Sequence, residues 1–333
     1  MTLLLMASAV DGVKVSLNNI IHRALSAAEP SGVARSDGKR PDGISMVPWK
    51  EGKQHAETLW HHHISPLLKE DQLLHPLEAR VYRECAASMR RIGRDCIEKR
   101  IKAVTTGGEV PNDILTQILQ ISCTDTSVDM ETLVDDFVTF YVAGQETTAN
   151  ALSFAVILIH QHPEVLDKLL SEIEDVLGDR KEVTGDDLDK LKYTEQVIQE
   201  VLRMYPTVIR MIKESPRGGL ELSGYHIPEG ASISFFTAVM SRNPAFFNDP
   251  DTFDPSRFDV DRPRPGPFVY FPFSVGHRSC IGRHFAMIGL KITLTRLLKT
   301  FRVTLPPSFS LVVEQRITLL PQGGVPCTLR EIS

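Results

Sequence analysis

The chain has 333 residues, of which 42% are hydrophobic, and carries a net charge of −5. This length and apolar content allow a large buried core, and a slightly acidic chain with no long basic run argues against nucleic-acid binding. Its five cysteines are scattered and form no C-x-x-C pair. This pattern argues against a disulfide scaffold or a zinc site and fits a reducing compartment.

The N-terminal segment gives few functional signals. Its first ten residues are mostly apolar, and Asp11 follows them. A stretch of this length is too short to cross a bilayer. No positive segment precedes it, so we expect the end of an amphipathic helix rather than a signal peptide. Residues 12–30 predict a helix, and residues 30–42 predict a flexible loop. The histidines of 60–63 are consecutive and cannot all face one ion on a helix, so metal binding is disfavoured.

Beyond these segments the apolar spacing predicts a mainly α-helical protein with small β-sheets. The predicted helices span 74–105, 113–122, 130–161, 163–177, 186–191, 193–205 and 281–301. Short strands and turns are expected in 220–237 and 302–330. The longest helix, 130–161, is apolar enough for a core position. Its polar stretch 145–148 argues against a membrane span.

A glycine lies in the middle of that long helix, in the run Ala143-Gly144-Gln-Glu146-Thr147. Glycine costs about 1 kcal/mol relative to alanine at such a position, so it calls for an explanation. Small residues here let the helix lie against a flat ligand and leave a groove for a diatomic molecule. Glu146 and Thr147 then form an acid–alcohol pair suited to proton relay. The alternative is an ordinary polar patch on a buried helix.

Opposite charges one turn apart follow at Glu200 and Arg203, a spacing that many surface helices share. Arg257 lies between aromatic residues in the segment 253–258. A carboxylate held between two guanidinium groups would form a rigid buried network. Arg210 and Lys213 follow the helix-stopping Pro206, in a segment expected to line a cavity. Each either pairs with an anionic ligand group or is solvated.

The most informative segment is the loop 273–282, which fits the pattern F-x-x-G-x-R-x-C-x-G. Such a loop, with a helix predicted directly after it near Ile281, presents one thiolate, from Cys280, to a haem iron. The positive N-terminal end of that helix favours the thiolate. A haem held in this way activates oxygen, because the sulfur donates electron density that favours O–O cleavage. The alternative is a buried structural cysteine in a glycine-containing loop.

The other fixed positions of the loop fit the same interpretation. Gly276 and Gly282 allow the backbone to approach a flat macrocycle closely. Phe273 is suited to pack near the sulfur and to exclude water. Arg278 is placed to pair with a haem propionate, as Lys213 is from its own segment.

Four of these segments, taken in order, resemble the cytochrome P450 superfamily. They are the run 143–148, the helix with Glu200 and Arg203, the segment 253–258 and the cysteine loop 273–282. The resemblance implies the cytochrome P450 fold lacking its N-terminal part. It implies that Cys280 is the axial iron ligand of haem b and that Thr147 is the oxygen-activating alcohol. It also implies that Glu200, Arg203 and Arg257 form a structural triad.

The chain also resembles one subfamily, the cholesterol 24-hydroxylases, over most of its length from about residue 80. The stretches that carry this resemblance are 93–119, 133–156, 270–282 and 326–330. It implies a sterol substrate in a largely apolar cavity lined by Ala143 and residues 208–212.

The resemblance also sets the expected domain organisation. Residues 1–333 are expected to form a single partial cytochrome P450 domain, the C-terminal two-thirds of a member, with a haem-binding core over 128–333. We expect this chain to lack the membrane anchor, the N-terminal sheet and several early helices of a full-length member. Lys213 stands where the family usually has a propionate-binding arginine, and lysine keeps the charge but loses the bidentate fork.

The expected function is that of a haem–thiolate monooxygenase hydroxylating a sterol with O2 and electrons from NADPH. Electrons are expected through NADPH–cytochrome P450 reductase, which would face the basic residues Arg278, Arg283, Lys291 and Arg296. The resemblance places the full-length protein on the cytosolic face of the endoplasmic reticulum membrane. Two alternatives stay open: a fatty-acid or xenobiotic hydroxylase of the same superfamily, and a non-catalytic fragment with exposed apolar surfaces.

Overall fold

The computed structural model describes residues 76–122, 129–263, 265–266 and 268–332. The expectations for the apolar N-terminus, the helix 12–30, the loop 30–42 and the histidines of 60–63 lie outside the described residues. The chain forms two compact units, and the boundary in the described sequence falls between Ala143 and Gly144.

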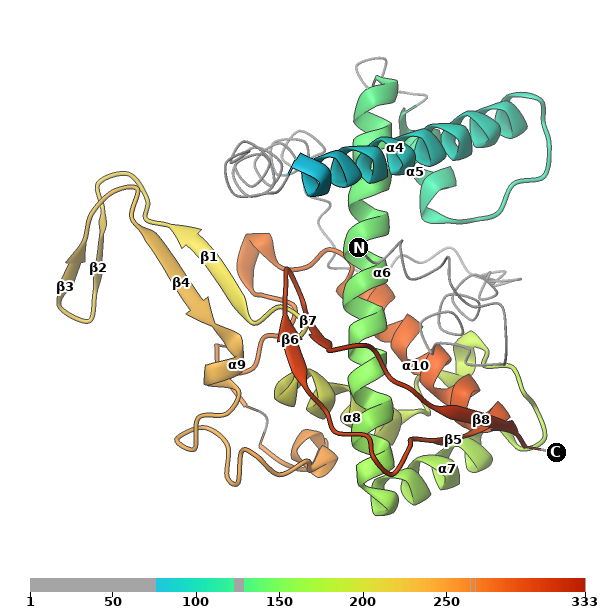
Figure 1. Ribbon diagram of the computed structural model, residues 1–333, viewed down its shortest axis with the longest axis vertical. Coiled ribbons are helices and arrows are strands. Elements are labelled where there is room, and N and C mark those ends of the chain that lie inside the picture. Colours follow the sequence, from blue (N-terminus) through green and yellow to red (C-terminus); the bar gives the residue numbers. More distant parts are fainter. Residues whose placement is uncertain (1–75, 123–128, 264, 267, 333) are drawn as a thin grey trace. The chain divides into compact units, whose positions relative to one another are not determined.

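The described chain is mainly helical with short antiparallel strands, as the sequence predicts (Figure 1). The α-helices are α4 Pro76–Thr105, α5 Ile114–Ser122, α6 Met130–Gln161, α7 Pro163–Leu177, α8 Lys192–Met204, α9 Thr237–Met240 and α10 Arg283–Thr300. The 3-10 turns are η3 Gly185–Asp187, η4 Pro255–Phe258 and η5 Gly276–Arg278. The strands are β1 Arg210–Glu214, β2 Leu220–Leu222, β3 Tyr225–Ile227, β4 Ser232–Phe236, β5 Phe301–Thr304, β6 Val313–Gln315, β7 Leu319–Pro321 and β8 Thr328–Glu331.

The first unit contains α4, α5 and the start of α6. Its small core is formed by Ile97, Leu119, Leu133 and Val134, all buried. Asp113 caps the start of α5, because its Oδ1 accepts a hydrogen bond of 2.9 Å from the Thr116 backbone N–H. Such a cap satisfies a helix-terminal donor, which explains why a helix is expected from this aspartate onward.

The second unit is built around the apolar half of α6. Residues 149–159 of α6 pack with one face of each of α7, α8 and α10 in a single core. The α7 face is formed by Val165, Leu169, Ile173 and Leu177, a four-residue spacing that gives one apolar stripe on a helix. The apolar part of α6 is long enough to cross a membrane, but 67% of it is buried within the protein. This burial fits a core helix.

The helix expected over 186–191 is instead the 3-10 turn η3 followed by turns. Asp187 is buried, and its carboxylate accepts hydrogen bonds from the Thr184 backbone N–H at 2.9 Å and from Arg180 at 2.9 and 3.0 Å. The hydrogen bond from Arg180 holds the pKa of Asp187 well below its usual value. These contacts favour a tight turn over a regular helix.

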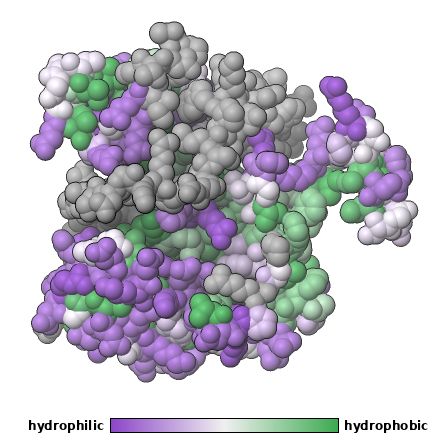
Figure 2. All heavy atoms as spheres, turned by 180° about the vertical axis from the view of Figure 1, so that it is seen from behind, coloured by the Kyte–Doolittle hydropathy of each residue, from purple (hydrophilic) through white to green (hydrophobic). Residues whose placement is uncertain are grey.

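Four two-stranded antiparallel sheets complete the described chain, paired as β1–β4, β2–β3, β5–β8 and β6–β7. The β1–β4 ladder runs from Arg210 opposite Phe236 to Glu214 opposite Ser232, and the sequence patterns did not predict β1. Figure 1 shows the β2–β3 pair beyond the far end of this ladder, after a bend in the chain. In Figure 2, hydrophobic and hydrophilic residues lie beside one another on these strands.

Candidate functional site

The loop that carries Cys280 is held by its own backbone. The Cys280 N–H donates to the Phe273 carbonyl at 2.8 Å, and the Ser279 N–H donates to the Gly276 carbonyl at 3.0 Å. Gly276 has a φ of 76°, a left-handed conformation that favours glycine. The loop therefore closes on itself and leaves Cys280 and Arg278 exposed.

The helix after the loop begins at Arg283, two residues later than the predicted start near Ile281. Gly282 occupies the N-cap position, and because glycine has no side chain, no side-chain group caps the helix there. A Cβ built on Gly282 would lie 3.8 Å from the Cys280 sulfur. The sulfur therefore lies near the N-terminal end of α10, where free N–H groups and the helix dipole favour negative charge.

These features fit a haem. The candidate ligand is one soft sulfur on an exposed side chain, as an axial thiolate requires. Its apolar neighbours Ile281 and Phe285 are 85% and 66% exposed, so the surface around the loop offers apolar area to a macrocycle. Phe273 packs against the core of the unit, and the Arg283 guanidinium lies 5.9 Å from the centre of its ring. Arg278 adds an exposed positive charge to the loop.

A buried ion pair anchors the second unit at α8. The Arg203 Nε donates to the Glu200 Oε2 at 2.7 Å, and Nη2 donates to Oε1 at 2.8 Å. Both side chains are completely buried. Arg203 also donates to the carbonyls of Ser241 at 2.8 Å and Pro250 at 2.7 Å. Every partner of this guanidinium is thus supplied within the fold, which a buried charge requires.

Arg257, from η4, joins the same carboxylate. Its Nε lies 3.3 Å from the Glu200 Oε1, and its Nη2 donates to the Asp249 carbonyl at 2.7 Å. The Asp254 N–H donates to the same Oε1 at 2.9 Å. The structure thus brings together Glu200, Arg203 and Arg257, the three residues that the resemblance implies as a triad.

Tyr270 links the start of the cysteine loop to α8, and no sequence pattern singled it out. Its hydroxyl donates to the Gln199 carbonyl at 2.9 Å, and its ring lies 4.7 Å from that of Phe258. Burial raises the pKa of Tyr270 strongly. The aromatic cluster of 270–273 was the available sequence signal. The Tyr270 contact ties the segment before Cys280 to the helix that holds the ion pair.

The polar residues of α6 have different surroundings. The Glu146 Oε1 accepts a hydrogen bond of 2.7 Å from the Thr318 hydroxyl. Thr147 is half-buried, whereas Ala143 and Gly144 are exposed. Among the described residues, no atom lies within 4 Å of a Cβ built on Gly144, so packing does not explain this glycine. Thr318 lies in a segment without a motif, and sequence patterns did not predict its contact.

The basic residues fall into two groups. Arg210 and Lys213 lie on β1, and both are exposed. Lys291 was expected at a reductase-facing surface, and this expectation is wrong. Its Nζ lies 2.5 Å from the Glu195 carboxylate and 3.0 Å from the Leu188 carbonyl, and its side chain is 10% exposed. Lys291 therefore holds α10 against α8.

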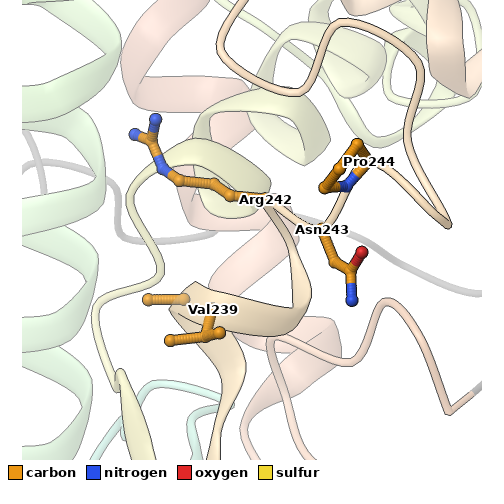
Figure 3. Close-up of a pocket in the computed structure, with 5 residues that line it drawn as sticks. Val239, Arg242, Asn243 and Pro244 are labelled. Carbon is orange, nitrogen blue, oxygen red and sulfur yellow. The ribbon is translucent and has the colours of Figure 1, made fainter.

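A surface depression lies at α9 and the turn after it (Figure 3). In Figure 3, Val239 lies on α9, and Arg242, Asn243 and Pro244 follow on the turn. Arg242 is already paired there with Asp251 at 2.6 Å. The depression contains none of the residues expected to hold haem, so it is not the candidate cofactor site.

Comparison with known families gives one match over most of the chain. Residues 58–325 match the family described as "Cytochrome P450". This range includes α6, α8, the segment of Arg257 and the cysteine loop.

Two curated relatives illustrate the similarity. The chain is 42% identical over 192 residues to "Cytochrome P450 4d2" of Drosophila melanogaster, covering 57% of this chain and 38% of the relative. It is 34% identical over 206 residues to "Cytochrome P450 4A14" of Rattus norvegicus, covering 62% of this chain and 40% of the relative. The matched segments thus span about two-fifths of the length of these relatives. Neither name refers to a cholesterol 24-hydroxylase, so these relatives support the wider family only.

A solved structure gives the same fold. "Crystal structure of cytochrome P450DA heme domain" superposes with a TM-score of 0.74 at 25% identity, covering 97% of this chain and 70% of that one. A second, "Crystal structure of a Cytochrome P450 (CYP102L1)", superposes with a TM-score of 0.68 at 24% identity, covering 87% of this chain and 66% of that one.

Proposed function

Because the chain belongs to the cytochrome P450 family, we propose that it is a haem–thiolate monooxygenase with Cys280 as the iron ligand. The observation that carries the proposal is the position of the Cys280 sulfur, exposed on a closed loop at the uncapped N-terminus of α10. Bound there, haem supplies oxygen activation, because a thiolate ligand favours O–O cleavage. The haem-binding core in this proposal is residues 128–333.

The loop residues, together with Lys213 on β1, each contribute one contact to the bound cofactor in this proposal. Cys280 supplies the thiolate, and the free N–H groups at the start of α10 stabilise its charge. Arg278 and Lys213 each neutralise a propionate. Phe273 excludes water from the sulfur. Gly276 and Gly282 let the backbone approach the macrocycle closely, because neither has a side chain.

The α6 residues handle protons and space on the oxygen side. Glu146 and Thr147 hold and pass protons, since a carboxylate and an alcohol on adjacent residues can exchange them through water. Ala143 and Gly144 leave room for the flat ring, because neither carries a side chain beyond Cβ.

The proposed substrate is a sterol. Its support is the resemblance of 93–119, 133–156, 270–282 and 326–330 to cholesterol 24-hydroxylases. The segment 208–212 contributes the exposed apolar side chains of Val208 and Ile212, which suit a sterol nucleus. A fatty acid or another apolar compound would also be accommodated by such side chains, so product analysis has to separate these classes.

The proposed electron donor is NADPH–cytochrome P450 reductase, at the endoplasmic reticulum membrane. The basic residues proposed to face it are Arg278, Arg283 and Arg296. Lys291 is left out because it is buried and paired with Glu195. Charge complementarity of this kind raises the rate of encounter and makes binding salt-dependent.

The ferrous–CO difference spectrum of the haem-loaded 333-residue chain tests the proposal. A red-shifted Soret band, typical of thiolate ligation, is expected for the parent chain and for Cys96→Ser, which removes another exposed cysteine. Cys280→Ser should lose the band. A parent chain without the band would overturn the assignment and favour a non-catalytic fragment.

A second experiment addresses the substrate. The chain that gives the expected band is supplied with reductase, NADPH and either cholesterol or a long-chain fatty acid. Hydroxylated cholesterol alone supports the sterol class, and a hydroxylated fatty acid alone contradicts it.

A further inference from the structure

Thr318 and Glu146 lie 172 residues apart in the sequence and are joined by a hydrogen bond of 2.7 Å. Thr318 is 5% exposed and lies between β6 and β7, whereas Glu146 lies on α6. A second bond of 3.0 Å runs from the Asn150 side-chain amide to the same hydroxyl oxygen. Asn150 is one turn after Glu146 on α6, so both helix residues contact one threonine.

The two hydrogen bonds of the Thr318 hydroxyl have a fixed direction. An amide N–H can only donate and an ionised carboxylate can only accept, so the hydroxyl accepts from Asn150 and donates to Glu146. A hydroxyl also keeps acceptor capacity when the carboxyl becomes protonated. Thr318 can therefore hold Glu146 in both protonation states, which valine in its place cannot do.

The backbone around Thr318 is held firmly. The Leu319 N–H donates to the Thr207 carbonyl at 2.8 Å, and the Arg316 N–H donates to the Thr318 carbonyl at 3.0 Å. The backbone of Thr318 is thus held by contacts that do not involve Glu146, and its hydroxyl accepts a further bond from Asn150.

The nearby charges have partners of their own. Arg316 pairs with Glu314 at 2.8 Å. The pKa of Arg316 is raised first by the hydrogen bond to Glu314 and to a lesser degree by the negative charge of Glu146. Arg316 thus attracts Glu146 only from a distance, and Thr318 donates a hydrogen bond to the Glu146 carboxylate.

We propose that Thr318, itself oriented by Asn150, is the positioning residue for the Glu146 carboxylate. This inference rests on the proposed function, in which Glu146 passes protons on the oxygen side of α6. Thr318 holds one carboxylate oxygen, Oε1, and so fixes the direction in which the other oxygen points. Loss of this contact lets the carboxylate turn and weakens proton delivery, while binding of the cofactor stays intact.

The first test measures the contact itself. Urea unfolding midpoints are compared for the purified full chain and for Thr318→Val, Glu146→Ala and the double variant. The double variant should shift the midpoint by less than the sum of the single shifts, because the two residues share one interaction. Additive shifts overturn the proposal.

The second test measures proton delivery as product formed per NADPH consumed by the haem-loaded chain. Thr318→Val should lower this ratio roughly tenfold, less than the roughly 10²- to 10⁴-fold contribution of an acid–base group itself, because Glu146 is still present. The Soret spectrum should stay that of the parent. Thr318→Ser, which keeps the hydroxyl, should restore the ratio to within about twofold of the parent, as a retained hydrogen bond requires.

The control is Thr304→Val, which removes a hydroxyl from an exposed position on β5, and it should leave the ratio unchanged. A parental ratio in Thr318→Val, or a loss that Thr318→Ser does not restore, contradicts the proposal. A parent chain without turnover means that the proposed function fails, and the unfolding comparison then decides the contact alone.

Discussion

Arg203 and Glu200 form an ion pair of 2.7 Å in which neither side chain is exposed to solvent. Removing two charges from water is costly unless the remaining donors and acceptors are also satisfied. Here Arg203 donates to carbonyls of the segment 241–252, and Glu200 also accepts from Arg257 and the Asp254 N–H. The pair therefore fastens η4 and the segment before it to α8.

The arginine fork of this pair should be essential for stability. Arg203→Lys keeps the charge but cannot reach the carboxylate and the carbonyls at once, so we expect a loss of about 3 kcal/mol in the free energy of unfolding. Urea denaturation measures it. The matched control is Arg302→Lys on the exposed face of β5, where a change below about 0.5 kcal/mol is expected. A loss in Arg203→Lys as small as that in the control would show that the network is dispensable.

Asp136 should make the first unit less stable as the pH rises. Burial raises its pKa to about 6, and among the described residues its Oδ2 has no hydrogen-bond partner. A carboxyl with a raised pKa in the folded state contributes stability below about pH 4, and this contribution is lost as the pH rises through 6. The full shift corresponds to about 3 kcal/mol. Because the side chain is only half-buried, solvent screening reduces the expected loss to about 2 kcal/mol at pH 7.

The experiment on Asp136 compares unfolding free energies between pH 4 and pH 7. Asp136→Asn should show a smaller fall than the parent chain, because its side chain does not ionise. Asp95→Asn on exposed α4 controls for removing one carboxylate from the same unit. A parental fall in Asp136→Asn would locate the pH dependence elsewhere.

Lys291 should matter for stability and not for reductase binding. Lys291→Met leaves the Leu188 carbonyl without its donor, so we expect a loss of about 1–2 kcal/mol in the free energy of unfolding. The salt dependence of reductase binding, measured by titration, should stay that of the parent. Lys181→Met, at a side chain that is 64% exposed, is the control for stability. A changed salt dependence in Lys291→Met would return this lysine to the reductase surface.

Lys213→Arg should strengthen haem retention. Both side chains carry one positive charge, but the guanidinium adds a planar fork that binds a propionate with two parallel hydrogen bonds. We expect haem loss to apomyoglobin to slow by about three- to tenfold. Lys299→Arg, at a lysine already paired with Glu174 at 2.7 Å, controls for the added guanidinium. An unchanged rate in Lys213→Arg would remove this residue from the propionate site.

Much of the helical framework could be predicted from local pattern. The expected spans 130–161 and 163–177 coincide with α6 and α7, because apolar spacing and a proline at the first helical position act within a few residues. The turn η3 and the strand β1 were missed. In the first case a buried aspartate contacts residues just before it, and in the second the pairing partner lies across a hairpin.

The sequence by itself determined the family, the mainly helical class and the cysteine loop before α10, because each depends on short-range spacing. Only the tertiary structure decided which side chains meet. It buried Lys291 against Glu195, brought Arg257 to Glu200, and placed Thr318 on Glu146. Contacts between distant parts of a chain depend on how the helices and strands pack, and periodicity within one element carries no information about its neighbour.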